Sequence, residues 1–277
     1  MAGMTDSSTP TLAFIGGGNM ARAILGGLIR RGHPLDQLLV VEPSAEAREH
    51  ILTEYGLSCM ESAGLKLNEA NVLVWAIKPQ TFKEAAAQVR PFCPHALHLS
   101  VAAGIRTDSL VDWLGTQRIV RGMPNTPALV GLGQTGLFAR DGVTAQERSW
   151  VEHIVACTGD SLWVAQEPLL DAVTALSGSG PAYVFFFIET MVRTGIDMGL
   201  TEAQAHQLAV GTFVGASALA RNATESPSVL RERVTSKGGT THAAITAMQT
   251  SGVPEHFRAA LMAACERARE LGDEFGR

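Results

Sequence analysis

Near its start, the chain passes from a short apolar run directly into a cluster of glycines. Residues 11–32 are TLAFIGGGNMARAILGGLIRRG, in which Gly16, Gly18 and Ala21 have the spacing G-x-G-x-x-G/A. Gly16 permits a tight strand-to-helix turn, Gly18 lets the backbone approach a pyrophosphate, and Ala21 allows close packing of the helix on a sheet. The helix start then offers N–H groups to phosphates. The segment predicts a dinucleotide-binding unit, and the plainer alternative is a flexible turn.

The N-terminal half alternates between short apolar runs and amphipathic segments, which is typical of repeated strand–helix units. Several runs are apolar without alternation, as expected of parallel strands that helices cover on both faces. The pattern predicts an α/β fold with a Rossmann-type, doubly wound sheet. The expected strands are Thr11–Ile15, Leu38–Val41, Leu57–Met60, Val72–Ala76, Leu97–Val101, Arg118–Met123, Gly136–Ala139 and Ser161–Val164.

After about Ala165, helical periodicity continues to the C-terminus. We therefore expect a dinucleotide-binding domain over residues 1–165 and an all-helical substrate and dimerisation domain over residues 166–277. The run YVFFFI at Tyr183–Ile188 is apolar on every side of a helix, so we expect burial against another subunit. The expected helices are Glu167–Leu176, Pro181–Met198, Thr201–Arg221, Pro227–Val234, Thr241–Ser251 and Pro254–Glu274.

Charge and cysteine content narrow the class of partner. A net charge of −5 gives no broad basic surface, so we expect a small-molecule substrate rather than nucleic acid. The four cysteines are far apart without a CxxC pair, which argues against disulfides and indicates a reducing compartment. No secretory leader and no apolar stretch of about 18 residues is visible, so we expect a cytoplasmic protein without membrane contact.

The second expected strand ends at Glu42, about 20 residues after the glycines, where a carboxylate would accept hydrogen bonds from the ribose hydroxyls of NAD. The 2′-phosphate of NADP would meet like charge there, so the residue favours NADH weakly. Ser44 and Arg48 follow closely and could still receive that phosphate, and Glu42 could also simply cap the helix at Pro43. Further cofactor contacts are expected after later strands, at Ala76–Pro79 and Ala102–Gly104.

Three other stretches suggest chemistry rather than packing: MPNTP at Met123–Pro127, LSGSGPAY at Leu176–Tyr183 and VTSKGGTTHAAI at Val234–Ile245. The last one is the most informative. Its segment SKGGTT precedes a helical pattern, so several free backbone N–H groups would point from a helix start and could receive a carboxylate. Taken alone, SKGGTT could also be an ordinary capped turn.

In this order, the motifs resemble those of the pyrroline-5-carboxylate reductases, which make proline by reducing a cyclic imine. The resemblance covers nearly the whole chain, from FIGGGNMA through AIKP, SVAAGI, RGMPNTPA and LSGSGPAYVF to LRERVTSKGGTTHAAI. It implies an NAD(P)H-dependent oxidoreductase of proline biosynthesis. It also implies a dinucleotide-binding domain, a helical domain that interlocks with a partner subunit, and dimers that can assemble into larger rings such as a decamer.

The resemblance assigns roles to residues of this chain. We hypothesise that N–H groups around Gly238, Gly239 and Thr240, with the Ser236 hydroxyl, bind the substrate carboxylate, and that the catalytic Thr241 hydrogen-bonds the ring nitrogen. Because a threonine hydroxyl is a poor proton source near neutral pH, the proton would come from solution or water. The implied substrate residues are Ser236, Lys237, Gly238, Gly239, Thr240 and Thr241. The implied cofactor residues are Ile15, Gly16, Gly17, Gly18, Asn19, Met20, Glu42, Pro43, Ser44, Ala76, Ile77, Lys78, Pro79, Ala102, Ala103, Gly104 and Asn125.

The chain departs from the family pattern at one position. The family often has a small hydroxyl residue, suited to a 2′-phosphate, where this chain has Glu42, which argues against a preference for NADPH. A β-hydroxyacid dehydrogenase is a rival, but that family has a lysine on the helix after a glycine-rich turn, and here no lysine occurs between Gly180 and Arg193. A redox sensor that binds the dinucleotide without consuming it is a second rival.

The eight histidines suggest neither a metal site nor an acid–base group. None belongs to an HExxH motif or another tight ligand pattern, so we expect no metal. His242 is the one histidine beside the expected substrate turn, and a place on the helix surface is the simpler interpretation.

Overall fold

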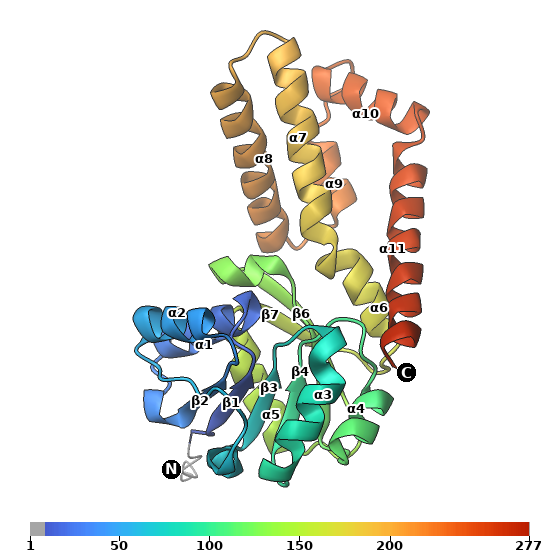
Figure 1. Cartoon of the computed structure of the whole chain (residues 1–277). Coiled ribbons are helices and arrows are strands. Elements are labelled where there is room, and N and C mark those ends of the chain that lie inside the picture. The colour runs from blue at the N-terminus through green and yellow to red at the C-terminus, as the bar shows by residue number, and fades with distance from the viewer. Residues whose placement is uncertain (1–8, 277) are drawn as a thin grey trace, which may run out of the picture. The chain divides into compact units, whose positions relative to one another are not determined.

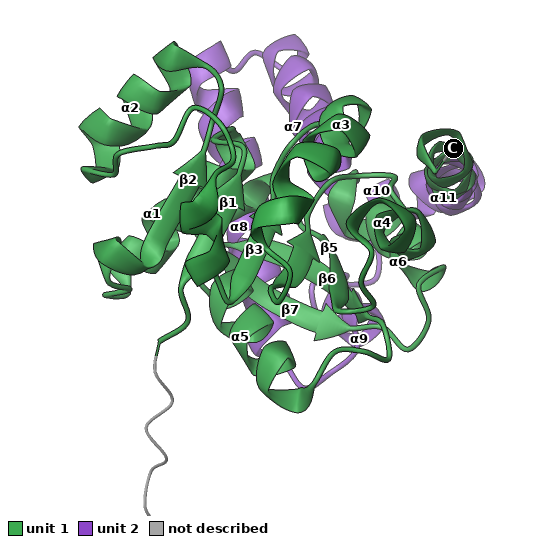
Figure 2. Ribbon diagram, turned by 60° about the horizontal axis from the view of Figure 1, so that its bottom comes forward, with its two compact units in different colours: residues 1–179, 264–277 green, residues 180–263 purple. Residues whose placement is uncertain are grey.

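The computed structural model describes residues 9–276. These residues form two compact units, unit 1 (residues 1–179 and 264–277) and unit 2 (residues 180–263), which Figure 2 shows in different colours. The last strand ends at Trp163, close to the division expected near residue 165. Unit 1 nevertheless continues to Ser179, because a short helical segment packs back on the sheet, and it includes the end of the last helix.

Unit 1 is built on a seven-stranded sheet with the order β2-β1-β3-β4-β5-β6-β7 (Figure 1). All neighbouring pairs are parallel except β5 and β6, which are antiparallel. The predicted Rossmann-type sheet is therefore confirmed. The strands are β1 Leu12–Ile15, β2 Leu38–Val41, β3 Val72–Trp75, β4 Leu97–Ser100, β5 Ile119–Met123, β6 Gly133–Ala139 and β7 Gly159–Trp163.

Helices cover both faces of the sheet, which explains the apolar runs without alternation. Along β1, Leu12 and Phe14 belong to one buried cluster and Ala13 and Ile15 to the other. The first cluster includes residues of α1 (Asn19–Arg30), α2 (Ala45–Tyr55) and α5 (Ala145–Ala156), and the second includes residues of α3 (Pro79–Val89) and α4 (Thr107–Leu114). Four 3-10 turns complete the connections: η1 Leu35–Gln37, η2 Leu65–Glu69, η3 Arg90–Phe92 and η4 Thr126–Val130.

One expected strand does not form as such. The segment Leu57–Met60 contributes a single parallel bridge, between Met60 and Val41 at the edge of β2. The bonds from Met60 N–H to Val40 O (2.8 Å) and from Glu42 N–H to Met60 O (2.9 Å) hold it there. The segment directly follows Gly56, which ends α2 in a left-handed conformation, and the chain bends away at residues 61–62, so the ladder stays short.

The strand order fixes where a ligand can lie. The chain runs from β1 to β2 on one side and then crosses to β3 on the other side of β1. In such sheets, ligands bind outside the carboxyl ends of the strands at the point where the order reverses. In this sheet that point lies after Ile15, where the glycine turn leads into α1.

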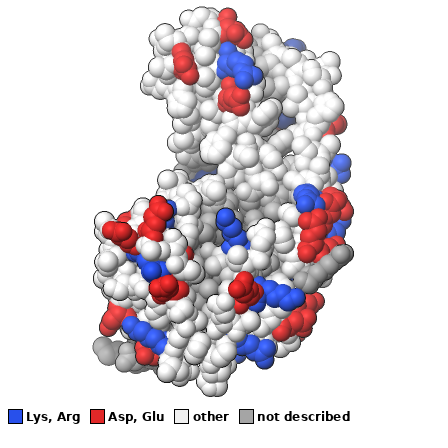
Figure 3. Space-filling view, viewed as in Figure 1, with Lys and Arg blue, Asp and Glu red and all other residues white. Residues whose placement is uncertain are grey.

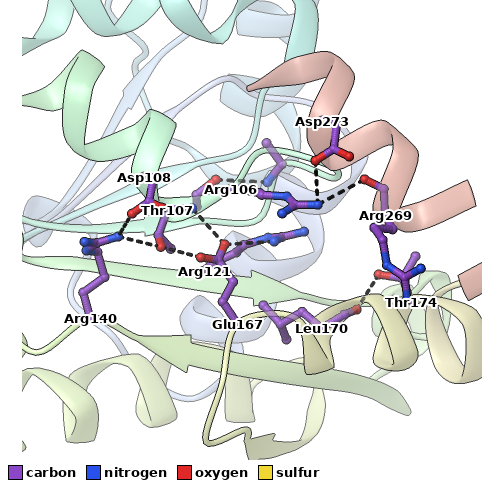
Figure 4. Close-up of polar contacts among 12 residues, drawn as sticks. Arg106, Thr107, Asp108, Arg121, Arg140, Glu167, Leu170, Thr174, Arg269 and Asp273 are labelled. Atoms are coloured by element: carbon purple, nitrogen blue, oxygen red, sulfur yellow. Dashed lines mark hydrogen bonds and ion pairs between the residues drawn. The ribbon is translucent and has the colours of Figure 1, made fainter. Parts of the chain in front are cut away.

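A short helical segment after the sheet is tied to it by ionic contacts. It comprises α6 (Leu169–Val173) and the π-helical turn η5 (Thr174–Gly178). Just before it, Glu167 accepts hydrogen bonds from the N–H (2.8 Å) and hydroxyl (2.5 Å) of Thr107 and from the guanidinium of buried Arg121 (2.9 Å) (Figure 4). These bonds join the start of α4, β5 and the connection after β7.

Unit 2 consists of helices. They are α7 (Gly180–Asp197), α8 (Glu202–Asn222), α9 (Pro227–Arg233), α10 (Thr240–Thr250) and the first part of α11 (Val253–Phe275). α7 and α8 form a hairpin, in which a Cβ at Gly195 would lie 2.9 Å from Ala205 Cβ. Thr201 and Gln204 form a capping box at the start of α8. Unit 2 is thus helical, as predicted.

The apolar run YVFFFI lies on α7, and much of it is exposed within this chain. Phe185 and Phe186 are 65% and 66% exposed, whereas Tyr183 and Phe187 contact the ring of Phe257 edge-on. Figure 3 shows long stretches over the helices of unit 2 without acidic or basic side chains. None of the described helices is long and apolar enough to cross a membrane.

Candidate active site

The glycine turn closes tightly on the sheet at its first residue and stays open at its third. Gly16 has a φ of +95°, and a Cβ there would lie 2.6 Å from Ile77 Cγ2 and 2.8 Å from Ala76 O. Around a Cβ at Gly18, by contrast, there is open space within 4 Å. The fold itself therefore requires glycine at position 16. At position 18 the absence of a side chain leaves space that a ligand can occupy.

The start of α1 is prepared to bind an anion. No side chain caps Gly18, and the first helical hydrogen bond runs from Arg22 N–H to Gly18 O (2.9 Å). The N–H groups of residues 19–21 therefore have no helical acceptor. Together with the positive end of the helix dipole, these groups suit a phosphate.

Glu42 binds the glycine turn rather than capping a helix. Its Oε2 accepts from Gly17 N–H (2.7 Å) and its Oε1 from Ser44 N–H (2.8 Å). The cap of α2 is Ser44, whose hydroxyl accepts from Ala47 N–H, so the alternative that Glu42 is the cap is wrong. Arg48 donates to the carbonyls of Glu42 and Pro43, which fixes its guanidinium beside the same loop.

These elements surround a cleft of about 670 Å³ at the carboxyl ends of β1, β2 and β3. Its lining includes eight of the residues expected to contact the cofactor: Ile15, Gly16, Gly18, Glu42, Pro43, Ala76, Ile77 and Lys78. The structure thus brings together three segments far apart in the sequence. The cleft lies where a doubly wound sheet binds its ligand, and its size and glycine-lined floor fit a dinucleotide.

The cleft has further lining residues that were not predicted from the sequence. On α3, Thr81, Glu84, Ala85 and Gln88 recur at helical spacing and form one wall. The sequence held this signal, because the four residues lie on one face of the helix after AIKP. A second group, Glu61, Ser62 and Ala63, follows the bridge at Met60, and no motif marked it.

The remaining expected cofactor residues lie elsewhere in unit 1. Gly17, Asn19, Met20, Ser44 and Pro79 are neighbours of cleft residues in the sequence but are not part of its lining. The stretch Ala102–Gly104 follows β4, which pairs with β3, and Val101 N–H donates to Trp75 O (3.1 Å). This stretch therefore starts from the same sheet edge, one strand further from β1.

Asn125 has both parts of its amide engaged by the protein. Its Oδ1 accepts from Gln134 N–H (2.9 Å), and its Nδ2 donates to Ser177 O (3.0 Å) in the π-helical turn η5. The residue is 8% exposed. Asn125 thus joins the loop after β5 to η5, and it is outside the lining of the cleft.

In unit 2, the SKGGTT turn leads into α10 without a capping side chain. Gly238 has a φ of +76°, and Gly239 is the N-cap residue. Gly239 N–H donates to Ser236 O (3.0 Å), and the first helical bond runs from Ala243 N–H to Gly239 O (3.1 Å). The N–H groups of residues 240–242 therefore have no helical acceptor, whereas the N–H of Gly239, expected to bind substrate, is already used.

The side chains of this turn are accessible. Ser236, Lys237, Gly238 and Thr240 are exposed in the chain, and Thr241 is partly exposed. Elsewhere in unit 2, the hydroxyls of Thr190 and Thr212 donate to the carbonyl four residues earlier in their helices. Thr241, the second residue of α10, has no helical carbonyl behind it, so its hydroxyl can serve a ligand.

The described residues contain no cluster of three or more His, Cys, Asp or Glu that could hold a metal ion. Near the cleft, burial and then the carboxylate of Glu42 raise the pKa of the Cys59 thiol. These two effects outweigh the opposing charge of Arg48, so the cysteine is protonated at neutral pH and is not an activated nucleophile. The polar groups on hand instead suit binding and positioning of anionic molecules.

Comparisons with known proteins agree with this arrangement. Residues 167–271 match the family model described as pyrroline-5-carboxylate reductase dimerisation, and residues 11–104 match the model described as NADP oxidoreductase, coenzyme F420-dependent. The chain is 41% identical to a pyrroline-5-carboxylate reductase of Pseudomonas aeruginosa over 97% of its length and 99% of that protein. It is 34% identical to the Pisum sativum enzyme of the same name, over 96% and 97% of the two chains. The chain belongs to the pyrroline-5-carboxylate reductases.

Solved structures of pyrroline-5-carboxylate reductases have the same fold. The Coxiella burnetii structure has a TM-score of 0.91 at 36% identity and covers 95% of this chain and 99% of its own. A Plasmodium falciparum structure with NADP bound has a TM-score of 0.83 at 26% identity, over 98% and 100% of the chains.

Membership of the family defines the reaction. The chain is an NAD(P)H-dependent oxidoreductase that reduces the C=N bond of 1-pyrroline-5-carboxylate to L-proline, in the last step of proline biosynthesis. The two rival assignments, a β-hydroxyacid dehydrogenase and a redox sensor, are therefore excluded. The match of residues 167–271 to a dimerisation domain also supports self-association of the chain, and the exposed rings of α7 agree with it.

Proposed function

We propose that unit 1 holds the cofactor in the cleft and that the start of α10 holds pyrroline-5-carboxylate. The observation that carries the substrate half is the uncapped start of α10, where the N–H groups of residues 240–242 have no helical acceptor. A carboxylate accepts such bonds and is stabilised by the helix dipole. Gly238 and Thr240, rather than Gly239, then supply the backbone donors expected from the sequence, and the Ser236 hydroxyl is the adjacent side-chain donor.

Thr241 orients the ring in this proposal. When bound, the reduced nicotinamide supplies a hydride to the imine carbon. The ring nitrogen gains a proton from solution or water, and the Thr241 hydroxyl forms a hydrogen bond with it without being a strong acid. Most of the acceleration comes from holding the imine carbon at the hydride donor, so positioning outweighs proton transfer by the protein.

Substitutions at Thr241 test the role of its hydroxyl. Thr241→Ala should lower kcat/KM for pyrroline-5-carboxylate by about tenfold to a hundredfold, as expected for a lost hydrogen bond to a charged group. Thr241→Ser keeps the hydroxyl and should retain most activity. Thr250→Ala, at the far end of α10, is the matched control. Equal kcat/KM for Thr241→Ala and Thr250→Ala would refute the assignment of Thr241.

For the cofactor we propose a preference for NADH. Three carboxylates line the cleft: Glu84 on the α3 wall, and Glu42 and Glu61 beside the loop that follows β2. Arg48 lies near the latter two, but its guanidinium donates to two carbonyls and pairs with Glu61 over 3.5 Å. A 2′-phosphate beside Glu42 would therefore meet net repulsion, whereas free ribose hydroxyls can donate to the same carboxylate.

The preference is tested by comparing the two cofactors at saturating substrate. The ratio of kcat/KM for NADH to that for NADPH should exceed one in the wild type. In Glu42→Ser it should fall by about tenfold or more, since the substitution removes the carboxylate that repels the 2′-phosphate. A wild type that prefers NADPH, or a ratio unchanged in Glu42→Ser, would rule out the proposal.

We further propose that the dimers assemble into a decamer and that the enzyme works in the cytoplasm. The decamer rests on the family resemblance, and native mass spectrometry would decide between two and ten subunits. The cytoplasmic location is supported by the four cysteines, none of which forms a disulfide in the described residues. Fluorescence of a tagged protein in living cells would test it.

A further inference from the structure

The end of α11 packs on the loop that follows β4. This loop, Val101–Arg106, includes the stretch Ala102–Gly104. Gly104 has a φ of +75°, and a Cβ there would lie 2.8 Å from Phe275 Cδ2 and 3.4 Å from Leu271 Cβ. The ring of Phe275 also packs against the second core cluster of the sheet. The glycine at position 104 thus lets the last turn of α11 lie directly on the loop.

Polar contacts hold the same two segments together. Arg106 pairs with Asp273 (2.8 Å) and donates to Arg269 O (3.2 Å), as Figure 4 shows. Ser109 Oγ donates to Gly276 O (3.1 Å). These contacts join residues about 165 positions apart in the sequence, so the C-terminal turn is a built part of unit 1 rather than a loose end.

The loop is fixed at its other end as well. Thr107 begins α4 and is fully buried, and both its N–H and its hydroxyl donate to Glu167. Glu167 in turn pairs with Arg121 of β5, 4% exposed at its side chain. At its start, Val101 N–H donates to Trp75 O of β3. Between these two fixed ends, Gly104 and Arg106 are held by their contacts with the end of α11.

The place of this loop in the sheet relates it to the cofactor. Glu42 follows β2, the glycine turn follows β1, and the Ala76–Lys78 segment follows β3. A dinucleotide that lies across the switch point with its adenosine ribose at Glu42 extends toward β3 and β4 with its nicotinamide end. The Val101–Arg106 loop is then the backbone nearest the nicotinamide. This placement rests on the proposed function.

We propose that the C-terminal turn of α11, through Phe275 and Asp273, is a positioning element that holds the Val101–Arg106 loop against the nicotinamide end of the cofactor. Phe275 and Asp273 touch neither cofactor nor substrate and act through the loop. Phe275 matters more, because the Arg106–Asp273 pair is largely exposed, with side-chain exposures of 38% and 62%, and exposed pairs contribute little.

The test separates positioning from affinity and from folding. Phe275→Ala should lower kcat by about tenfold, since small misplacements of a reacting group can slow a reaction a hundredfold. The dissociation constant for NADH, measured by fluorescence, should change less than about twofold, because the adenosine half keeps its contacts. Turnover is expressed per NADH-binding site, so an unfolded fraction does not enter kcat.

Two matched variants complete the series. Phe275→Leu keeps an apolar contact on Gly104 and should recover most of the lost kcat. Glu270→Gln alters only an exposed pair with Arg267 on the same turn and should match the wild type. With (4-²H)-labelled NADH, the isotope effect on kcat in Phe275→Ala should be at least that of the wild type, because hydride transfer has become slower.

Ala103→Leu distinguishes failure of this inference from failure of the proposed cofactor placement. If Ala103→Leu lowers turnover but folded Phe275→Ala equals the wild type, the positioning role of α11 is wrong. If Ala103→Leu leaves turnover unchanged, the loop does not border the nicotinamide, and both the placement and the inference fail. A loss of NADH binding in proportion to the loss of kcat in Phe275→Ala would also overturn the inference, since it indicates a merely structural role.

Discussion

The two units bury apolar surface in different ways. Unit 1 encloses two clusters on the faces of its sheet, and even large side chains such as Phe14, Trp75 and Phe82 are fully buried. Within residues 180–263, the buried hydrophobic side chains are two alanines, Ala205 and Ala209. Unit 1 therefore has a core of its own, whereas unit 2 needs a second chain to cover its apolar surface.

The largest effect should come from breaking the buried ion pair of unit 1. Glu167→Ala removes the paired carboxylate of buried Arg121 and the acceptor of both Thr107 donors, so it should lower the free energy of unfolding by roughly 3–5 kcal/mol. All four tryptophans lie in unit 1, and their fluorescence during urea titration reports on this unit alone.

Glu270→Ala is the control for this prediction. It removes an exposed pair with Arg267 and should leave the urea midpoint close to that of the wild type. Similar midpoints for the two variants would mean that the contacts of Glu167 do not stabilise unit 1.

Acid should weaken unit 1 through His98. Burial, with the Arg118 charge, lowers the pKa of His98 to about 4, and Trp75 Nε1–H donates to its Nδ1 (3.0 Å). The unfolded chain takes up a proton near pH 6.5, whereas the folded chain does not until about pH 4. The free energy of unfolding therefore falls by about 3 kcal/mol as the pH is lowered from 6.5 to 4.

The pH slope is measured from urea midpoints in that interval. His98→Gln can still accept from Trp75 but does not titrate, so its stability should depend less steeply on pH. The same slope in both proteins would show that His98 does not account for the loss.

A charge on the exposed face of unit 2 should weaken self-association. Phe186→Glu places a carboxylate where a partner would bury a ring, which should weaken the dimer by about a hundredfold in dissociation constant. Leu65→Glu is the matched control, because Leu65 is 83% exposed but belongs to unit 1.

Sedimentation velocity at several protein concentrations gives the mass of both variants. Only Phe186→Glu should dissociate, and its tryptophan fluorescence should stay that of folded unit 1. An unchanged mass for Phe186→Glu would contradict the assignment of this face to a subunit interface.

The smallest effect is expected from substitutions in the glycine turn, which should change the affinity for NADH. Gly18→Val enters open space and should leave stability unchanged, yet weaken NADH binding by about tenfold, because a side chain there keeps the pyrophosphate away. Gly16→Ala should weaken binding and also destabilise the unit, since its Cβ meets Ile77 at a positive φ. Titration of NADH fluorescence and urea unfolding measure the two effects, and normal NADH affinity in Gly18→Val would be the contrary result.

Periodicity and glycine spacing predicted most of unit 1. Seven of the eight expected strands form, because a continuous apolar run such as that of β1 can be buried only between two helical layers. The Leu57–Met60 segment has a similar composition, but its pairing depends on the turns around it, which composition does not report. Spacing likewise located the glycine turn and Glu42.

Contacts between distant segments could not be predicted from the sequence. The bonds of Asn125 to Gln134 and Ser177, and the packing of Phe275 on Gly104, depend on the tertiary fold and leave no local pattern. In unit 2, the motif SKGGTT predicted a helix start. The hydrogen bond from Gly239 N–H to Ser236 O, which makes this N–H unavailable to a ligand, depends on the local turn geometry.

Hydride transfer from NADH to the imine can be followed directly with deuterium. Wild-type enzyme is incubated with pyrroline-5-carboxylate and NADH deuterated at the transferred C4 position, and the product is examined by mass spectrometry and NMR. L-proline with one deuterium at C5 is expected, formed in equal amount to the NADH consumed. NADH that binds but is not consumed, with NADPH equally inert, or proline without deuterium, would contradict it.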